Sequence, residues 1–267
     1  MSEDRKTLGP ARRPFTARSV IASTLLGVDP PRLPALLLAR SGELFGMSEG
    51  STRVALSRMV AAGELEPDDG GYRLAGHLLD RQERQRTSRA PVRRRWTGDW
   101  TMAVVGDGRR AAVDRAALRS AMRVLHLAEH REGIWLRPDN LAPDRDEAAM
   151  SVLDAQCHRF TARPDDEDPR ALAAGLWDLE AWMVNARAAQ AEMDALIGPL
   201  EAGDTASLPA GFVLSAEVLR LLVADPLLPD ELLPPAWPGV EIRATYDRYD
   251  RAFKSVWRSW FRAQPAR

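Results

Sequence analysis

Residues 46 to 74 read GMSEGSTRVALSRMVAAGELEPDDGGYRL. Ser48 is a favourable N-cap, because its hydroxyl oxygen can accept a hydrogen bond from a backbone N–H of the first helical turn. Gly63 ends the predicted helix, since glycine adopts the left-handed conformation of a C′ residue without strain. The turn Asp69-Gly70-Gly71 lies between two short strand patterns and indicates a β-hairpin. A short helix followed by such a hairpin predicts a winged helix-turn-helix that binds DNA.

The predicted helix has an apolar face and a polar, basic face. Thr52, Ala55, Leu56 and Met59 recur at helical spacing and are expected to face the core. The opposite side is small, polar and basic, which suits a surface that enters a DNA groove. The alternative is a generic amphipathic helix whose arginines are merely solvated. The candidate DNA-binding residues are Ser48, Ser51, Thr52, Arg53, Val54, Ser57, Arg58 and, from the hairpin, Arg73.

The charge of the chain is unevenly distributed along its length. The net charge over all 267 residues is −1. Residues 1 to 98 hold 17 Lys+Arg and 11 Asp+Glu, a balance of +6, and the remainder hold 20 and 27, a balance of −7. Positive charge therefore accompanies the predicted helix-turn-helix, where it can neutralise DNA phosphates.

The remaining composition bears on compartment and cofactors. Cys157 is the single cysteine of the sequence, which excludes an intrachain disulfide and fits a reducing compartment. We find neither a run of about 20 apolar residues nor a secretory signal, so we expect a cytoplasmic protein with no membrane association. The sequence shows no phosphate-binding glycine loop and no metal-ligand spacing, so we expect neither a cofactor nor a bound metal.

Before residue 96 the sequence predicts further helices and a basic run. Residues 17–26 indicate a first helix, and a second begins near Pro34, a residue suited to a first helical turn. Residues 78–95 contain seven arginines. This run is either a solvated connector helix or a basic linker beside the DNA backbone, and the charges alone do not distinguish the two.

From Trp96 onward the pattern predicts an α+β segment and then a helical segment. Residues 96–105 indicate a strand, 112–124 a helix, and 125–128 and 133–137 short strands. Helices are predicted over 170–198, 208–224 and 240–263, and the proline-rich stretch 225–239 is expected to be a non-helical connector. The predicted division is a disordered basic arm at 1–16, a winged helix-turn-helix at 17–80, an Arg-rich linker at 81–95, an α+β domain at 96–165 and a helical domain at 170–265.

Stretches along nearly the whole chain resemble the PaaX-type transcriptional regulators, known as repressors of phenylacetate catabolism. The first stretch lies in residues 53–74, and the second combines residues 96–100 with 133–141. The third and most specific is DPLLPDELLP at 225–234 together with Trp237-Pro238-Gly239. One departure from the family pattern is the hairpin turn, which carries Asp68 and Asp69 where a basic tip would contact phosphate.

The resemblance implies a fold and a function. It implies an α+β multidomain protein with an N-terminal winged helix-turn-helix, a ferredoxin-like middle domain and an all-helical C-terminal domain. It also implies a homodimer that binds a palindromic double-stranded DNA operator and is released by a small effector such as an aryl-acetyl-CoA thioester. The middle fold is similar to a small CRISPR-associated nuclease subunit, so the alternative function is a metal-dependent nuclease with Asp107 as a metal ligand.

Candidate effector-binding residues follow from the chemistry of such a ligand. Aromatic rings suit flat apolar groups, and guanidinium groups match phosphate oxygens. Each of these residues has an alternative place in the core or on the surface. A Cys157-His158 catalytic dyad is a minor alternative to an ordinary helical pair, and we expect no enzyme. The effector candidates are Arg131, Trp135, Arg137, Trp177 and Trp182.

Overall fold

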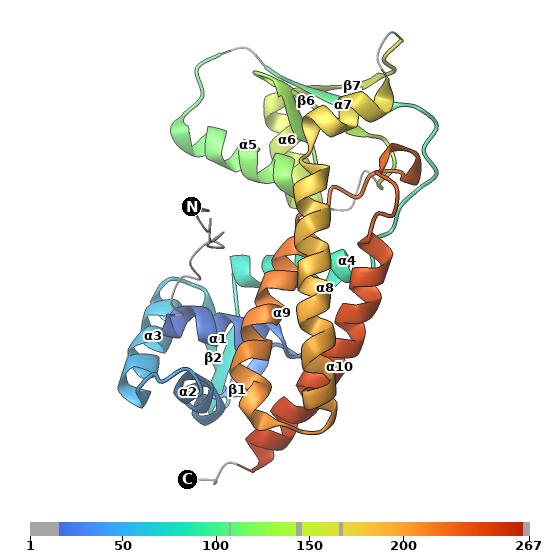
Figure 1. The fold of residues 1–267 in the computed structure, drawn as a ribbon. Coiled ribbons are helices and arrows are strands. Elements are labelled where there is room, and N and C mark those ends of the chain that lie inside the picture. The colour runs from blue at the N-terminus through green and yellow to red at the C-terminus, as the bar shows by residue number, and fades with distance from the viewer. Residues whose placement is uncertain (1–15, 107, 143–145, 166–167, 264–267) are drawn as a thin grey trace, which may run out of the picture. The chain divides into compact units, whose positions relative to one another are not determined.

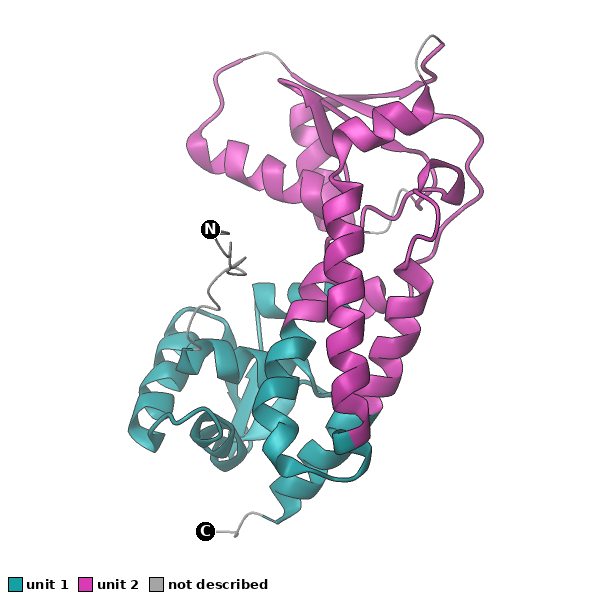
Figure 2. Cartoon of the chain, viewed as in Figure 1, with its two compact units in different colours: residues 1–85, 199–216, 252–267 teal, residues 86–198, 217–251 magenta. Residues whose placement is uncertain are grey.

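The computed structural model describes residues 16–106, 108–142, 146–165 and 168–263. The chain clusters into two compact units (Figure 2). Unit 1 comprises 1–85, 199–216 and 252–267, and unit 2 comprises 86–198 and 217–251. The segment predicted as a separate helical domain, 170–265, contributes to both units. The predicted arm at 1–16 lies outside the described residues except for Thr16.

The N-terminal part of unit 1 combines helices with a small antiparallel sheet (Figure 1). The sheet has the strand order β1-β3-β2, in which β2 and β3 form the predicted hairpin. Strand β1 was not predicted; it pairs with β3 so that Leu33 lies opposite Tyr72. The elements are α1 (Ala17–Leu26), β1 (Arg32–Pro34), α2 (Ala35–Glu43), α3 (Glu49–Ala61), β2 (Leu65–Asp68), β3 (Gly71–Leu74) and α4 (His77–Arg89), which continues into unit 2.

Local sequence signals explain where the first helices begin and end. Thr16 caps α1 in a reciprocal capping box with Ser19. Ser48 caps α3, and its hydroxyl accepts a hydrogen bond of 3.2 Å from the backbone N–H of Ser51. Gly63 follows α3 with a φ of 68°, a conformation that favours glycine. The predicted bounds of α1 and α3 are therefore confirmed.

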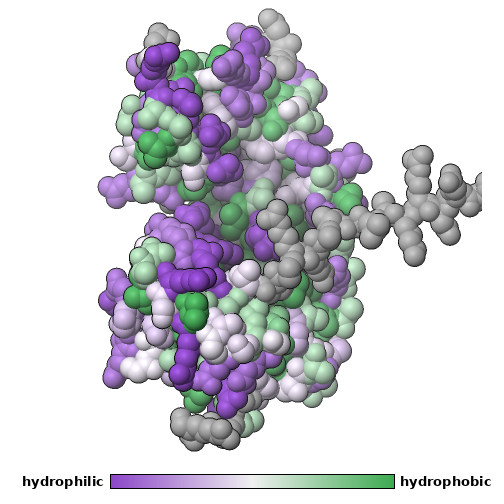
Figure 3. Space-filling model, turned by 90° about the vertical axis from the view of Figure 1, so that its left-hand side faces the viewer, coloured by the Kyte–Doolittle hydropathy of each residue, from purple (hydrophilic) through white to green (hydrophobic). Residues whose placement is uncertain are grey.

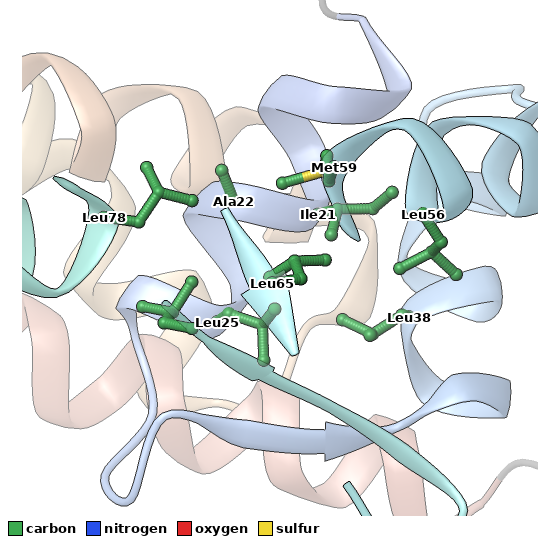
Figure 4. Close-up of a cluster of buried hydrophobic side chains, with 9 residues drawn as sticks. Ile21, Ala22, Leu25, Leu38, Leu56, Met59, Leu65 and Leu78 are labelled. Carbon is green, nitrogen blue, oxygen red and sulfur yellow. The ribbon is translucent and has the colours of Figure 1, made fainter. Parts of the chain in front are cut away.

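A leucine-rich core joins these elements (Figure 4). Ile21 and Leu25 from α1, Leu38 from α2 and Leu56 from α3 point toward the same interior. Each buried side chain of this size stabilises the fold by about 1.5 to 3 kcal/mol relative to its exposed state. The remaining members are Ala22, Met59, Leu65, Leu74 and Leu78. This core fixes the inner face of α3 and leaves its outer face to solvent.

Helices α2 and α3 approach closely at Gly42. A Cβ atom at this position would lie 2.6 Å from the hydroxyl oxygen of Thr52, so only glycine fits without a shift. Both residues are buried. The pair therefore sets the distance at which α3 lies against α2.

Unit 2 contains an α+β segment with the element order strand–helix–strand–strand–helix–strand. Its described part forms an antiparallel sheet in the order β5-β6-β4-β7. The strand expected at 125–128 begins only at Ala128, because Leu125 and Leu127 pack into the core at the end of α5. The elements are β4 (Trp100–Val105), α5 (Ala112–Val124), β5 (Ala128–Arg131), β6 (Ile134–Pro138), α6 (Glu147–Gln156) and β7 (Cys157–Ala162).

Each face of this sheet packs against a separate cluster. Ala103 of β4 lies with Leu118 and Met122 of α5 and with Leu153 of α6. On the other side, Trp100 of β4 packs in a cluster with residues of α7 and of the segment 225–238. The two faces alternate along β4, as the period of a strand requires.

The C-terminal residues are helical apart from the proline-rich connector. The prediction of a single helix over 170–198 is wrong, because Trp177 and Asp178 are not helical and separate α7 from α8. The Asp178 carboxylate instead accepts a hydrogen bond of 3.0 Å from the backbone N–H of Ala181 and so caps the start of α8. The helices are α7 (Pro169–Leu176), α8 (Leu179–Glu201), α9 (Leu208–Val223) and α10 (Gly239–Arg262), with 3₁₀ turns at Thr205–Ser207 and Asp230–Leu232.

One stretch of the described chain, Thr205–Val223, is long and apolar enough to cross a membrane by length and composition. Core helices of soluble proteins have the same properties. Within this stretch Leu208, Leu214 and Val218 are almost fully buried. The expected α+β class is confirmed, because the described chain has two small sheets and a helical C-terminal region.

Candidate nucleic-acid interface

Helix α3 presents a polar, basic surface opposite its buried face. Thr52, Leu56 and Met59 are at most 3% exposed. The other side is exposed and consists of Ser51, Arg53, Val54, Ser57 and Arg58. The side of unit 1 that carries α3 faces the viewer in Figure 3, where hydrophilic residues are interspersed with small hydrophobic areas. The surface is suited to a polar, charged partner.

Thr52 is removed from the candidate contacts by its burial. It is 0% exposed, and its hydroxyl lies 3.3 Å from the Ser48 carbonyl oxygen, to which it donates. A side chain in the core cannot reach a base or a phosphate. The prediction of Thr52 as a DNA-binding residue is therefore wrong, and its role is to pack α3 against Gly42.

The two arginines of α3 differ in their present partners. Arg53 Nη2 lies 2.6 Å from Glu49 Oε1, an i,i+4 pair in which both side chains are more than half exposed. Such exposed pairs contribute little free energy, so Arg53 can exchange Glu49 for another anion. Within the described residues Arg58 makes no ion pair. Arg58 is thus already available to a ligand.

The β2–β3 hairpin carries more acid than base toward its turn. Arg73 Nη2 lies 2.5 Å from Glu66 Oε2 across the strand pair. Asp68 lies 3.8 Å from Arg32 Nη1, and Asp69 follows it in the turn. Arg73 is exposed as predicted, but it is neutralised by its neighbour.

Arg89, the last residue of α4, is engaged within unit 2. Arg89 lies 2.6 Å from Asp247 and 2.9 Å from Asp250, both on α10, and its guanidinium is 5.0 Å from the ring centroid of Tyr246. Burial alone lowers the pKa of Arg89, but its hydrogen bonds and the charge of Asp250 outweigh burial and raise it. The guanidinium therefore stays charged, and this part of the arginine run has a structural partner.

Arg93 and Arg94 are also held by carboxylates. Arg93 Nη1 lies 2.8 Å from Asp230 and donates to the Leu228 carbonyl oxygen at 2.8 Å. Arg94 Nη2 lies 2.9 Å from Asp139. The stretch 81–95 is consequently helical up to Arg89 and then anchored, which favours the connector interpretation over a free basic linker.

Among the effector candidates, Arg137 is unavailable to a phosphate. It is 2% exposed, and its guanidinium donates to Asn140 Oδ1 at 2.7 Å and to carbonyl oxygens of Leu125 and Pro138. The pocket that it lines has a volume of about 40 Å³, whereas ligand pockets have volumes of roughly 300 to 1,000 Å³. Arg137 is therefore a structural residue, and its prediction as an effector contact is wrong.

Two of the other effector candidates, Trp135 and Trp177, lie on opposite faces of the sheet. Trp182 is 6% exposed, stacks on Trp237 at a centroid distance of 4.4 Å and donates its indole N–H to the Leu221 carbonyl oxygen, so it is a core residue. Trp177 is half-buried against the Trp100 cluster, and Trp135 packs on the opposite face of the sheet. Arg131 is exposed at the end of β5. These side chains do not form one site.

The residues considered for catalysis do not form a reactive group. Cys157 and His158 were expected to be an ordinary helical pair, but Cys157 begins strand β7. Burial raises the pKa of the Cys157 thiol, and this effect outweighs the nearby charge of Arg110, which lowers it. The raised pKa disfavours the nucleophilic thiolate. In the described ranges, no three His, Cys, Asp or Glu side chains converge as metal ligands. Asp107 lies outside the described residues.

Comparisons with known proteins identify the family. A family model described as PaaX-like protein matches residues 16–78, and a model of the PaaX-like protein C-terminal domain matches residues 177–263. The chain belongs to the PaaX family. This is a family of transcriptional regulators, and its members are regulatory rather than enzymatic.

One solved structure is similar over nearly the full length of the PaaX-family chain. It is the uncharacterized protein Rv0674 from Mycobacterium tuberculosis, with 40% sequence identity and a TM-score of 0.67. The match covers 91% of this chain and 98% of that chain. A search of curated proteins gave no match.

Proposed function

We propose that the protein is a sequence-specific DNA-binding transcriptional repressor that reads its operator with α3. The observation that carries this proposal is the division of α3 into a fully buried face and an exposed face that bears Arg53 and Arg58. The family of transcriptional regulators to which the chain belongs supports it. Specific readout requires side chains at base edges, and α3 offers them on one side.

The arrangement around α3 supports a winged helix-turn-helix. Helix α2, a short turn and α3 are followed by the hairpin β2–β3, and β1 completes the sheet. The 13 residues of α3 give a length of about 20 Å. A major groove about 12 Å wide admits one α-helix, so α3 enters it with its exposed face toward the bases.

Each exposed residue of α3 has a chemically suited contact. Arg58 donates two parallel hydrogen bonds to the O6 and N7 acceptors of guanine. Arg53 leaves Glu49 and takes a phosphate or a second base. Ser51 and Ser57 donate to phosphate or base edges, and the Val54 side chain contacts a thymine methyl group. Ser48 and Arg73 lie at the margins of this surface and contact phosphates.

The rest of the proposed mechanism concerns unit 2 and assembly. The strand–helix–strand–strand–helix–strand order of unit 2 supports a ferredoxin-like fold. A homodimer in the cytoplasm places two copies of α3 on half-sites about 34 Å apart. A small effector, such as an aryl-acetyl-CoA thioester, releases the operator by binding the conformation that cannot dock. Support for the dimer and the effector comes from the family resemblance.

The decisive experiment is a gel-shift titration of the promoter fragment upstream of the protein's own gene. Arg58→Ala is expected to weaken binding by about 1 to 3 kcal/mol, the discrimination of one bidentate base contact. Arg53→Ala is expected to have a smaller effect, because Arg53 must first leave Glu49. The matched control is Arg258→Ala, an exposed arginine on α10 whose Nε donates only to a carbonyl oxygen of its own helix.

The outcomes separate cleanly. If Arg58→Ala and Arg258→Ala bind the fragment equally well while both remain folded, α3 does not read the DNA. Thermal-shift measurements with a panel of CoA thioesters test the effector, because a ligand that prefers the native state raises the melting temperature. A panel that leaves the melting temperature and the gel shift unchanged removes this class of effector.

A further inference from the structure

Helix α5 of unit 2 carries a row of arginines that the proposed readout by α3 does not use. Arg115, Arg119 and Arg123 are spaced four residues apart and are all exposed. Residues four apart are neighbours on a helix surface, so the guanidinium groups form a stripe beside the buried face of Leu118 and Met122. Arg109, also exposed, precedes the helix.

The stripe lacks the carboxylate partners found elsewhere in unit 2. Arg89, Arg93, Arg94, Arg159, Arg163 and Arg243 each lie within 4.0 Å of an Asp carboxylate. In the described parts of the chain, none of the three α5 arginines makes such a pair; Arg115 donates to the Arg110 carbonyl oxygen. Like charges at i,i+4 destabilise a helix, and an external polyanion would remove this repulsion.

The uncharged residues of α5 permit close approach. Ala112 and Ala116 lie between the arginines on the helix surface and are exposed. Their small side chains allow the helix backbone to lie near a ligand while the longer arginines reach around it. The acidic residue of α5, Asp114, lies four residues before Leu118 and so falls on the side of the buried face, not in the arginine row.

We infer that the α5 stripe is a second DNA-contacting surface, which binds the phosphate backbone independently of sequence. Arg123 lies eight residues after Arg115, which is a rise of about 12 Å along the helix. Phosphates rise 3.4 Å apart along one strand, so three guanidinium groups face a run of three or four phosphates. Guanidinium forks pair with phosphate oxygens through charge-assisted hydrogen bonds. This inference rests on the proposed DNA binding and adds a contact that α3 does not supply.

The test compares the salt dependence of binding for three proteins. The probe is a random-sequence duplex of about 40 base pairs, roughly four helical turns, titrated by fluorescence anisotropy between about 50 and 200 mM salt. The stripe variant combines Arg115→Gln, Arg119→Gln and Arg123→Gln, because glutamine preserves helix propensity. The control combines Arg170→Gln, Arg220→Gln and Arg251→Gln, exposed arginines on three different helices that give the same change of net charge.

The stripe variant is expected to reduce the slope of log K against log salt by up to about 2.7, or 0.9 for each phosphate contact. Its affinity is expected to fall roughly 10- to 100-fold at the lower salt concentrations, while the control variant binds like the parent protein. The single variant Arg119→Gln is expected to change the slope by about 0.9. This single change keeps the test valid if the triple variant folds poorly.

Several results would overturn the inference. One is an unchanged slope for the folded stripe variant, and another is an equal loss in the control variant, which would make net charge the cause. A third is a loss of binding to single-stranded RNA or to anionic lipid vesicles with duplex binding unaffected. A parent protein that binds no duplex would instead overturn the proposed function itself, and the inference with it.

Discussion

Arginines occur both on α3 and in residues 89–94, but the two groups differ in their ion-pair partners. Arg58 faces solvent on α3 and makes no ion pair with a described residue. Arg89 is held between Asp247 and Asp250, and Arg93 and Arg94 are held by Asp230 and Asp139. The carboxylates that decide this difference come from positions 45 to 161 residues away. A basic run therefore indicates a DNA contact only where the fold does not hold its charges against carboxylates from distant segments.

Substituting arginines of the two groups is expected to have its largest effect on the free energy of unfolding. Arg89→Ala is expected to lower the free energy of unfolding by about 3 kcal/mol, because it leaves Asp250, with 9% of its side chain exposed, as a buried charge without its guanidinium partner. Arg58→Ala, a substitution at an exposed site without such a partner, is expected to change stability by less than about 0.5 kcal/mol. Chemical denaturation with an unchanged m-value measures both.

A double-mutant cycle of Arg89→Ala and Asp250→Ala identifies the cause. If the pair is responsible, the double variant is less destabilised than the sum of the single variants. Additive effects would instead mean that Arg89 stabilises the protein through Asp247 or through its contact with Tyr246, and not through Asp250.

The second effect is on DNA affinity, for which the substitution on α3 is expected to matter more than the substitution of a paired arginine. Arg94→Gln is expected to bind the promoter fragment within about twofold of the parent protein, because Asp139 already neutralises Arg94. Arg58→Ala is expected to lose about 1 to 3 kcal/mol on the same fragment. A loss for Arg94→Gln as large as that for Arg58→Ala would show that the segment after α4 lies on DNA, which is the linker interpretation of the sequence.

The helices α1 and α3 of unit 1 were predictable because their signals are local. Ser48 and Gly63 bound α3 in the sequence as they do in the structure. Strand β1 was missed because it has only 3 residues, too few for a strand pattern to be recognised, and one of them is a proline. Strand β7 was missed because its residues are largely exposed and polar, and its assignment depends on pairing with β4, which is distant in sequence.

The candidate site residues divide in the same way. The periodicity of α3 predicted its exposed face and also placed Thr52 on the core face, where the structure has it. Naming Thr52 as a DNA contact went against that pattern. Arg137 was predicted as a phosphate ligand because its residue type is suited to that role. The groups that accept its hydrogen bonds, among them three backbone carbonyls and Asn140, are brought together only by the fold. The spacing of Arg115, Arg119 and Arg123 was visible in the sequence, but their lack of carboxylate partners was not.

A third effect concerns the packing of α3 against α2 at Gly42. Gly42→Ala is expected to destabilise the protein by about 1 to 3 kcal/mol, because the added methyl group overpacks the contact with Thr52. It is also expected to weaken promoter binding in the folded fraction, since α3 shifts relative to the rest of unit 1. Combining Gly42→Ala with Thr52→Ala makes room for the methyl group. Failure of this double variant to recover stability would mean that Gly42 matters for another reason.

The smallest effect tests an arginine of unit 1 that is paired. Arg18 of α1 donates from Nε to Glu64 Oε2 at 2.8 Å, and this hydrogen bond lowers the pKa of Glu64 below its ordinary value of 4.5. A carboxyl group with a lowered folded-state pKa stabilises the protein above the unfolded-state pKa, and this stabilisation disappears as the pH falls through the folded-state value. Because Arg18 is 54% exposed, Glu64→Gln is expected to cost only about 0.5 to 1 kcal/mol at neutral pH.

The pH dependence distinguishes pairing from packing at this position. The difference in unfolding free energy between the parent protein and Glu64→Gln is expected to shrink as the pH is lowered below 4.5. Urea denaturation at several pH values measures it. A difference that persists through this range would mean that Glu64 stabilises the turn after α3 by its shape or its neutral hydrogen bonds. The conclusion that arginines held by carboxylates of distant segments are structural would then rest on the arginines of unit 2 alone.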